Sequence, residues 1–208
     1  MFRIFLVLGA VFYCVIVSPN AASQTAAEIE YLRTLEAQLP GELVNNPIDL
    51  DWSVNGSDYS SKSVEAKNTP LGVAFRIKIK KQQRNPWDIA INAPVKDGVA
   101  KGDVILVAFW ARATSPEKEK GQAQIQMRFQ MKSDPFTGIV EKLVDLNETW
   151  QIHYVRGRAE QDYKAGATNV SFNVGMKKQT LEFGPLYVMD LGPDANLDTL
   201  PNNSVDME

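Results

Sequence analysis

The sequence has very little cysteine and histidine. Cys14 is the only cysteine among 208 residues, and His153 is the only histidine. A single cysteine forms no internal disulfide and no cysteine-ligated zinc site. A Ser-His-Asp triad has only His153 to draw on, and no Gly-x-Ser-x-Gly motif accompanies it. Stability is therefore expected to come from a hydrophobic core.

The apolar run at the start of the chain is shorter than a helix that spans a membrane. Arg3 precedes an apolar stretch at residues 4–17, and small residues follow at Ala21-Ala22-Ser23. A spanning helix needs about 20 apolar residues. The pattern predicts a secretory signal peptide at residues 1–23, cleaved after Ser23, with an uncleaved anchor as the alternative. A secreted or periplasmic chain without a membrane span is expected, and cleavage would also remove Cys14.

An excess of charge of one sign is also missing. The chain has 22 Lys and Arg against 25 Asp and Glu, a net charge of −3, with both signs interspersed. Because no basic face is evident, nucleic acid is not expected as a partner.

A short helix is predicted at residues 24–42, and it opens with a capping box at Thr25–Glu28. Pro40-Gly41 ends it, and its apolar face consists of Ile29, Leu32, Leu35 and Leu39. A helix this short is marginal alone, so we expect it to pack on the domain or to act as a spacer. A small oligomerisation element is the alternative.

Residues 43–191 alternate between apolar and polar side chains with a period of two. In the clearest case, Ile125, Met127 and Phe129 alternate with glutamines and Arg128. Short strands of this kind, separated by turns and not by helices, predict an antiparallel sandwich or barrel. Residues 192–208 are acidic and polar, and are predicted to be a disordered tail.

Several segments of this region form a set: Asn85-Pro86-Trp87-Asp88, Lys101-Gly102-Asp103 followed by Val107–Arg112, the strand at Trp150, and Gln179–Gly184 running into Leu186–Leu191. With them, residues 43–191 resemble the carbohydrate-binding modules of families 4 and 9, which are galactose-binding-like jelly rolls. The resemblance implies an all-β jelly-roll β-sandwich and non-catalytic recognition of a polysaccharide or glycan. The resemblance is stronger evidence for the fold than for the identity of the ligand.

The residues themselves suggest where a sugar would bind. A sugar ring needs an aromatic plane for its C–H face and planar polar groups for its hydroxyls. The strand at residues 122–132 turns an outer row of amides and Arg128 away from the core. If it neighbours the strand that ends at Arg112, then Trp110 and Arg112 share its face. The candidate carbohydrate-binding residues are Trp87, Asp88, Trp110, Arg112, Gln124, Gln126, Arg128, His153 and Asn173.

Each candidate has an ordinary structural interpretation. A polar outer face is normal for an antiparallel sheet, and amides with arginine are what set this one apart. Trp110 could pack under a loop, and Trp87 could belong to the core or stand at a rim. Arg112 could pair with a carboxylate such as Glu119.

No cofactor is expected; the alternative is a structural calcium ion, which is common in jelly rolls of this type. No compact acidic loop such as an EF-hand is present, and Asp190 near the last strand is the only candidate ligand that we name.

Two other function classes remain open. Gln151-Ile152-His153 and Tyr163–Gly166 are similar to two short motifs of family 7 polysaccharide lyases, although the spacing differs and an Arg-x-Glu-x-Arg element is missing. A lyase predicts His153 in a pocket, within hydrogen-bond reach of Tyr or Arg. A structural or adhesion protein predicts an exposed apolar patch.

Overall fold

The structure is a computed structural model that describes residues 26–115 and 123–202. The predicted signal peptide, the capping threonine Thr25 and the alternative ion-pair partner Glu119 lie outside the described residues. Within this range, no helix is both long and apolar enough to cross a membrane.

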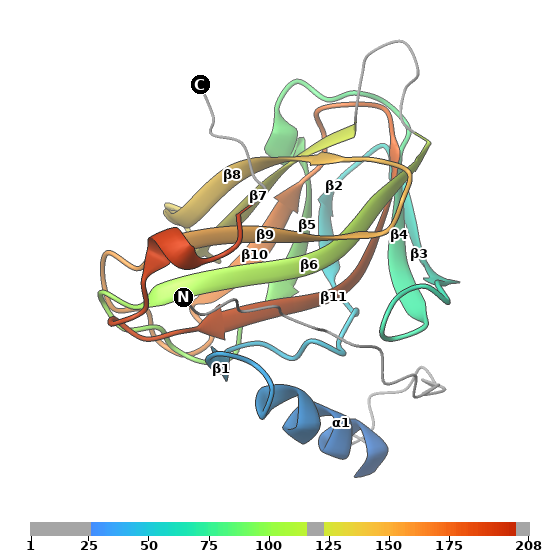
Figure 1. Ribbon diagram of the computed structural model, residues 1–208. Coiled ribbons are helices and arrows are strands. Elements are labelled where there is room, and N and C mark those ends of the chain that lie inside the picture. Colours follow the sequence, from blue (N-terminus) through green and yellow to red (C-terminus); the bar gives the residue numbers. More distant parts are fainter. Residues whose placement is uncertain (1–25, 116–122, 203–208) are drawn as a thin grey trace.

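Two antiparallel sheets form a sandwich (Figure 1). The six-stranded sheet has the order β3-β4-β11-β6-β9, with β1 added on β11; it consists of β1 (Glu42–Leu43), β3 (Tyr59–Glu65), β4 (Val73–Ile79), β6 (Val104–Ser115), β9 (Gln151–Arg158) and β11 (Thr180–Asp190). The five-stranded sheet has the order β2-β5-β10-β7-β8; it consists of β2 (Ser53–Gly56), β5 (Ile89–Pro94), β7 (Ala123–Met131), β8 (Gly138–Leu146) and β10 (Thr168–Asn173). The expected jelly-roll β-sandwich is confirmed.

The space between the sheets is filled by the apolar residues of the alternating strands. Phe172 of β10 lies at the centre of an aromatic cluster, with its ring centroid 4.9 Å from that of Phe109 and 4.8 Å from that of Phe183. Trp52 closes the cluster at 5.8 Å from Phe172. Because Phe109 and Phe183 belong to the opposite sheet, these contacts hold the two layers together.

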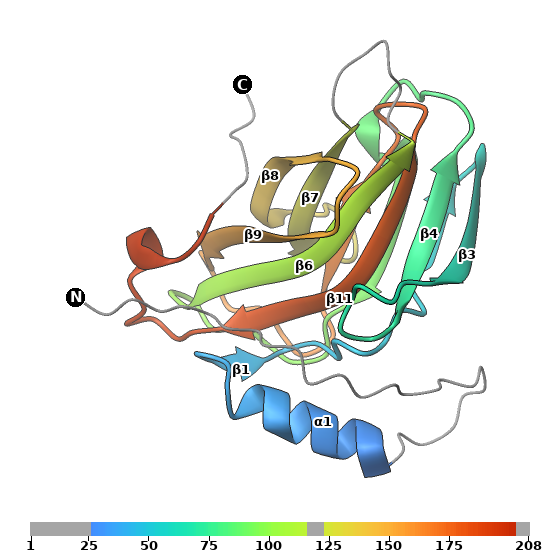
Figure 2. The same cartoon turned by 45° about the vertical axis from the view of Figure 1, so that its right-hand side comes forward.

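The helix α1 (Ala26–Glu36) lies beside β1 and β11 (Figure 2). Leu35 is buried in a second apolar cluster with Leu106 and Ala108 of β6 and with Tyr187 and Met189 of β11. This cluster is on the outer face of the six-stranded sheet. The prediction that the helix packs on the domain is therefore confirmed, and β11 is covered on both faces.

The chain after β11 does not follow the prediction of disorder from residue 192. A short 3-10 helix, η2 (Leu197–Thr199), lies beside β9, and Arg156 of β9 donates to the carbonyl of Leu200 at 2.7 Å. Arg158 donates to the carbonyl of Pro193 at 2.9 Å. Two arginines that bind main-chain carbonyls fix residues 193–200, and composition alone did not reveal them.

The aromatic cluster provides a test of how the layers are held together. Phe172→Ala is expected to lower the free energy of unfolding by about 3–5 kcal/mol, because it leaves a cavity at the centre of the sandwich. Urea unfolding of the two proteins would measure the difference. Phe136, which is 45% exposed, provides the matched control, and Phe136→Ala should change stability by less than about 1 kcal/mol. Equal effects at the two positions would contradict this account of the core.

Candidate functional site

The outer face of the five-stranded sheet carries most of the expected polar residues. Because Ile125, Met127 and Phe129 of β7 point into the core, the residues between them point outward. On β10 the inward position of Phe172 likewise turns Ser171 and Asn173 outward. In register, Asn173 lies opposite Gln126, and Ser171 lies opposite Arg128. We call this surface the amide face: Asn92 of β5, Gln124, Gln126, Arg128 and Gln130 of β7, and Asn169, Ser171 and Asn173 of β10.

The amide face is a connected layer of hydrogen bonds. Asn173 donates from its amide nitrogen to Gln126 at 2.8 Å, and Gln126 donates to Glu141 of β8 at 2.7 Å. Ser171 donates to Asn173 at 3.1 Å. The layer therefore runs across three adjacent strands and holds its amides in fixed orientations.

The row on β7 is less open than expected. Gln126 and Gln130 are both only 6% exposed, whereas Gln124 and Arg128 are half-buried. The expectation of an open row is thus wrong for these two glutamines, and Asn173 and Ser171 on β10 are also buried, at 2% and 1% exposed, because neighbouring polar side chains cover them. The helix α1 does not cover these residues, since it packs on the outer face of the other sheet.

Two amide oxygens in the layer lack a hydrogen-bond donor among the described residues. They are Oε1 of Gln130 and Oδ1 of Asn169, which are buried and belong to residues directly opposite in the β7–β10 register. Buried acceptors in proteins normally receive a hydrogen bond. Both oxygens are covered by their neighbours, so they are unpaired inside the layer and are not open to a ligand.

Charge on the amide face is close to balanced. The Nε atom of Arg128 lies 3.2 Å from Glu141, and Gln124 donates to Asp145 of β8 at 2.8 Å. A second anion brought to Arg128 would meet the carboxylate of Glu141, whereas Asp145 lies four residues further along β8. The face is thus better suited to a neutral ligand than to an acidic one.

Exposed aromatic residues lie at both ends of this sheet. Trp87, in the 3-10 helix η1 (Pro86–Asp88), is 56% exposed. Its turn is fixed at the end of β10, where Gly175 donates to the carbonyl of Pro86 at 2.9 Å. A side chain at Gly175 would collide with this carbonyl, so glycine permits the close approach. The exposed position agrees with the rim interpretation of Trp87.

The second aromatic, Phe136, is 45% exposed in the β7–β8 hairpin. Arg128 donates to its carbonyl at 2.9 Å. Sequence analysis did not single out Phe136. Its place directly after the turn residues Asp134-Pro135 could have indicated that its side chain is exposed.

Asp88 was expected to bind sugar on the outer face of its strand. In the structure it instead stabilises the turn of η1. Its carboxylate accepts from the backbone nitrogen of Asn85 at 2.9 Å, and so caps the turn that holds Trp87.

Trp110 and Arg112 lie on the other sheet. The chain crosses between the layers after β6, so β6 pairs with β9 and β11 whereas β7 pairs with β8 and β10. Trp110 packs half-buried beside the cluster under α1. The alternative interpretation, that Arg112 pairs with a carboxylate, is confirmed. Its partner is Glu182, with Nε of Arg112 2.6 Å from Oε2.

His153 points into the core and not outward as expected. It is 3% exposed and stacks on Phe109 with centroids 5.4 Å apart. Ile152 and Tyr154 take the outer face instead, where they pack on the second apolar cluster. The sequence did not indicate this facing because β9 carries bulky apolar residues on both of its faces.

The buried His153 gives no support to the lyase alternative. No described residue hydrogen-bonds its Nε2 atom, and Phe109 occupies its ring face. Burial lowers the pKa of His153 to about 4, against a weaker opposing effect of a hydrogen bond to the backbone of Ala111.

The residues near Asp190 do not fit a structural calcium ion. Burial raises the pKa of Asp190, and its carboxylate accepts from Gly192 at 2.8 Å. The neighbouring Asp103 accepts from the backbone of Ala100 at 2.9 Å. Among the described residues, no three acidic, histidine or cysteine side chains gather where they could hold a metal ion. We therefore assign no role to calcium.

The comparisons with known proteins bear on the fold. A CBM4 carbohydrate-binding module has 19% identity over 72% of this chain and 92% of its own, with a TM-score of 0.51. The N-terminal cellulose-binding domain of β-1,4-glucanase C from Cellulomonas fimi has 12% identity over 73% of this chain and 95% of its own, with a TM-score of 0.50.

The CBM22-1–GH10 modules of xylanase 10B from Clostridium thermocellum, complexed with xylohexaose, have 12% identity over 76% of this chain and 30% of their own, with a TM-score of 0.51. No protein-family model matches the chain, and neither does any curated protein sequence. At these identities the likeness establishes the architecture, and the chain has the jelly-roll fold of carbohydrate-binding modules.

The buried histidine predicts a pH-dependent stability. Between about pH 6.5 and 4 the unfolded chain binds a proton at His153 that the folded chain does not, so stability falls as the pH falls. The loss should reach about 3 kcal/mol by pH 4. Urea unfolding at several pH values would compare wild type with His153→Phe, which keeps an aromatic ring in the core. The two pH profiles should diverge below pH 6.5, and parallel profiles would contradict the assignment.

Proposed function

We propose that this protein binds a neutral polysaccharide on the amide face. The observation that carries the proposal is the hydrogen-bonded layer of amides across β10, β7 and β8, with exposed aromatic residues at both ends of the same sheet. Amides are suited to sugar hydroxyls because each offers fixed donors and acceptors, and an exposed indole provides a plane for the C–H face of a ring.

Charge argues for a neutral ligand. Glu141 already balances Arg128, and Asp145 stands beside Gln124. A uronate or sulfate group at Arg128 would be repelled by Glu141, and one at Gln124 would be repelled by Asp145. The similarity of fold to a cellulose-binding domain and to a xylan-degrading protein bound to xylohexaose supports β-linked plant polysaccharides as the first ligands to test.

We also propose that the protein acts outside the cytoplasm. This part rests on the signal peptide expected at residues 1–23. Detection of the mature protein in a cell-free culture fraction or in a periplasmic extract would support this location.

Trp87 is the residue to change first. Trp87→Ala is expected to weaken binding to soluble xylan or hydroxyethyl-cellulose at least about tenfold, because a stacking plane is lost while the fold is kept. Isothermal titration calorimetry of both proteins would measure the change.

The matched control is Trp110→Phe, which alters a tryptophan on the opposite sheet and should leave the affinity unchanged. Failure of the wild type to bind either polymer, or equal affinities of wild type and Trp87→Ala, would refute the proposed site.

A further inference from the structure

The outer face of the six-stranded sheet carries a row of charged residues from one strand to the next. In register, Lys62 of β3 lies opposite Arg76 of β4, Arg76 opposite Glu182 of β11, and Glu182 opposite Arg112 of β6. The row therefore crosses four strands, a width of about 14 Å. It holds three cations and one carboxylate.

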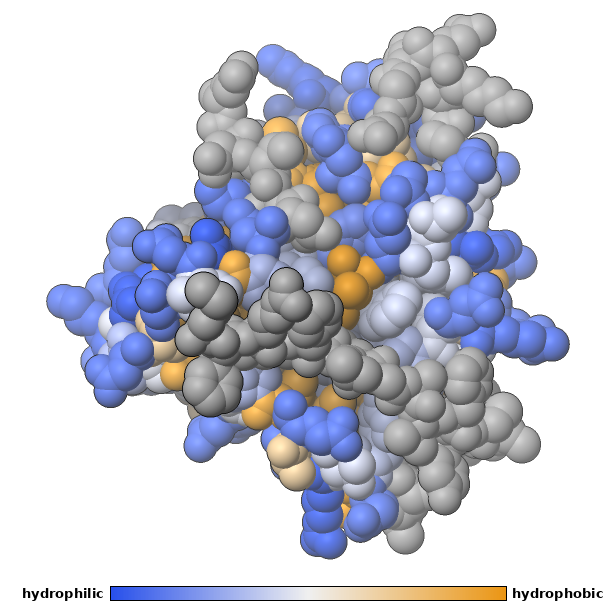
Figure 3. Space-filling view, in the orientation of Figure 1, coloured by the Kyte–Doolittle hydropathy of each residue, from blue (hydrophilic) through white to orange (hydrophobic). Residues whose placement is uncertain are grey.

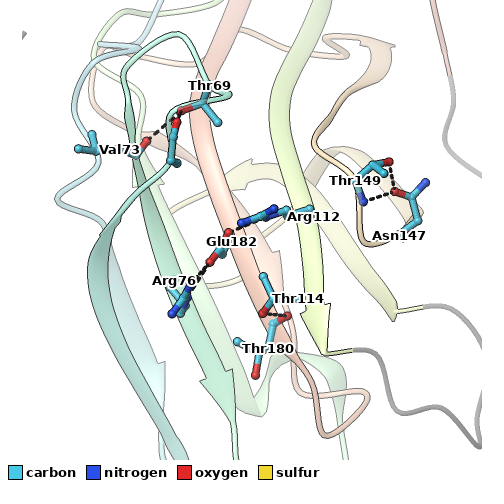
Figure 4. A network of polar contacts seen from close by, with 10 residues as sticks. Thr69, Val73, Arg76, Arg112, Thr114, Asn147, Thr149, Thr180 and Glu182 are labelled. Carbon is cyan, nitrogen blue, oxygen red and sulfur yellow. Dashed lines mark hydrogen bonds and ion pairs between the residues drawn. The ribbon is translucent and has the colours of Figure 1, made fainter. Parts of the chain in front are cut away.

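The two arginines are fixed by the buried carboxylate between them (Figure 4). Glu182 is fully buried, and its two oxygens each accept a hydrogen bond of 2.6 Å, one from Nε of Arg76 and one from Nε of Arg112. The guanidinium of Arg112 also lies over the ring of Trp150, 4.9 Å from its centroid. Both arginine side chains remain about a third exposed, at 35% and 28%.

Further cations lie next to the row. Lys78 follows Arg76 on the same face of β4 at an interval of about 7 Å, and Lys80 comes directly after the end of β4. Lys62, Lys78 and Lys80 are exposed, and no ion pair joins them to any residue in the described part of the chain. We call these five cations around Glu182 the basic corner: Lys62, Arg76, Lys78, Lys80 and Arg112. Asp58, whose carbonyl accepts from the backbone of Lys80 at 2.8 Å, adds a second carboxylate at the edge. Together with Glu182 it leaves a net charge of about +3 there, although the whole chain is slightly acidic.

An ion-pair network that served only stability would not need this excess. A buried carboxylate needs a partner, and one arginine would neutralise Glu182. The second arginine and three unpaired lysines add repulsion instead, which an anionic ligand would relieve. The arginines, anchored by their Nε atoms, are preorganised for that ligand.

The surroundings indicate a polysaccharide as the carrier of the anionic groups. The hydroxyls of Thr114 and Thr180 lie beside the arginines (Figure 4), and hydrophilic residues dominate this side of the molecule (Figure 3). The exposed large apolar residues, Ile29, Trp87 and Phe136, lie on other elements, so nothing described here would enter a lipid bilayer. Two indoles lie nearby: Trp150 is already stacked on Arg112, and Trp110 packs half-buried on the second apolar cluster, so neither offers a free ring to nucleic-acid bases.

We propose that the basic corner is a second binding site, for the carboxylate or sulfate groups of an acidic polysaccharide. It is separate from the amide face, because the two surfaces are the outer faces of opposite sheets. A chain with both sites would link a neutral polymer to an acidic one.

The test uses the full mature protein with polygalacturonate and dextran sulfate as probes, and affinity electrophoresis as the measurement. The triple variant Lys62→Gln, Lys78→Gln, Lys80→Gln leaves Glu182 and both arginines in place. It should bind at least one of the two probes about tenfold more weakly than wild type, because three exposed charge pairs with the polymer are lost. Binding should also weaken as salt is raised. The two probes together identify which acidic group is bound.

A matched triple variant, Lys96→Gln, Lys101→Gln, Lys164→Gln, makes the same change in net charge with exposed lysines at the other end of the sandwich. It should bind like wild type. Equal weakening by both triple variants, or no binding of either probe by wild type at low salt, would overturn the second site. Tighter binding of anionic phospholipid vesicles or duplex DNA would overturn its assignment to polysaccharide.

The Trp87→Ala variant distinguishes this proposal from the proposed function. It should bind the acidic probes with wild-type affinity while it loses affinity for xylan or hydroxyethyl-cellulose. A loss of affinity for the acidic probes on Trp87→Ala would mean that they occupy the amide face, and the second site would be wrong.

Discussion

The inward packing of Phe172 between Phe109 and Phe183 is the contact on which the amide face depends. It joins the two sheets, and it fixes which way β10 faces. In a strand the neighbours of an inward residue must point outward, so Ser171 and Asn173 point to the outer face of the sheet only because Phe172 points into the core. A slip of one residue would place the amides in the core and the ring in water. The hydrophobic core and the polar surface are thus two results of one register.

The two outer faces of the sandwich have become different surfaces. On the five-stranded sheet, amides and paired charges form a nearly neutral layer. On the six-stranded sheet, the helix α1 covers one part and leaves a charged corner beside it. The apolar part and the charged part of that sheet meet near Trp110, which packs on one, and Arg112, which belongs to the other. A single fold can therefore present two unlike surfaces without a second domain.

Sequence alone predicted the fold and the outward direction of several candidate side chains, and it did so for a physical reason. Where a strand has one apolar and one polar face, as in the strand of Phe129 and the strand of Phe172, alternation reveals which residues point outward. His153 was misplaced because its strand is apolar on both faces, and periodicity cannot then decide which face is inner. Arg112 was assigned to the wrong surface because alternation carries no information on which sheet a strand joins. The partner of Arg112, Glu182, is 70 residues away and became visible only from the register of the strands.

The position of β11 has a consequence for how the molecule opens. This strand lies between β4 and β6, and residues 181–189 are buried on both of its faces. Its amide protons can exchange with solvent only when both neighbouring strands, the helix cover and the core separate together. Hydrogen exchange in β11 should consequently report the opening of the whole domain, whereas the edge strands β3 and β2 exchange through local fraying. Exchange in this strand thus measures global stability, and a ligand on either outer face would slow it by an amount that grows with the ratio of ligand concentration to Kd.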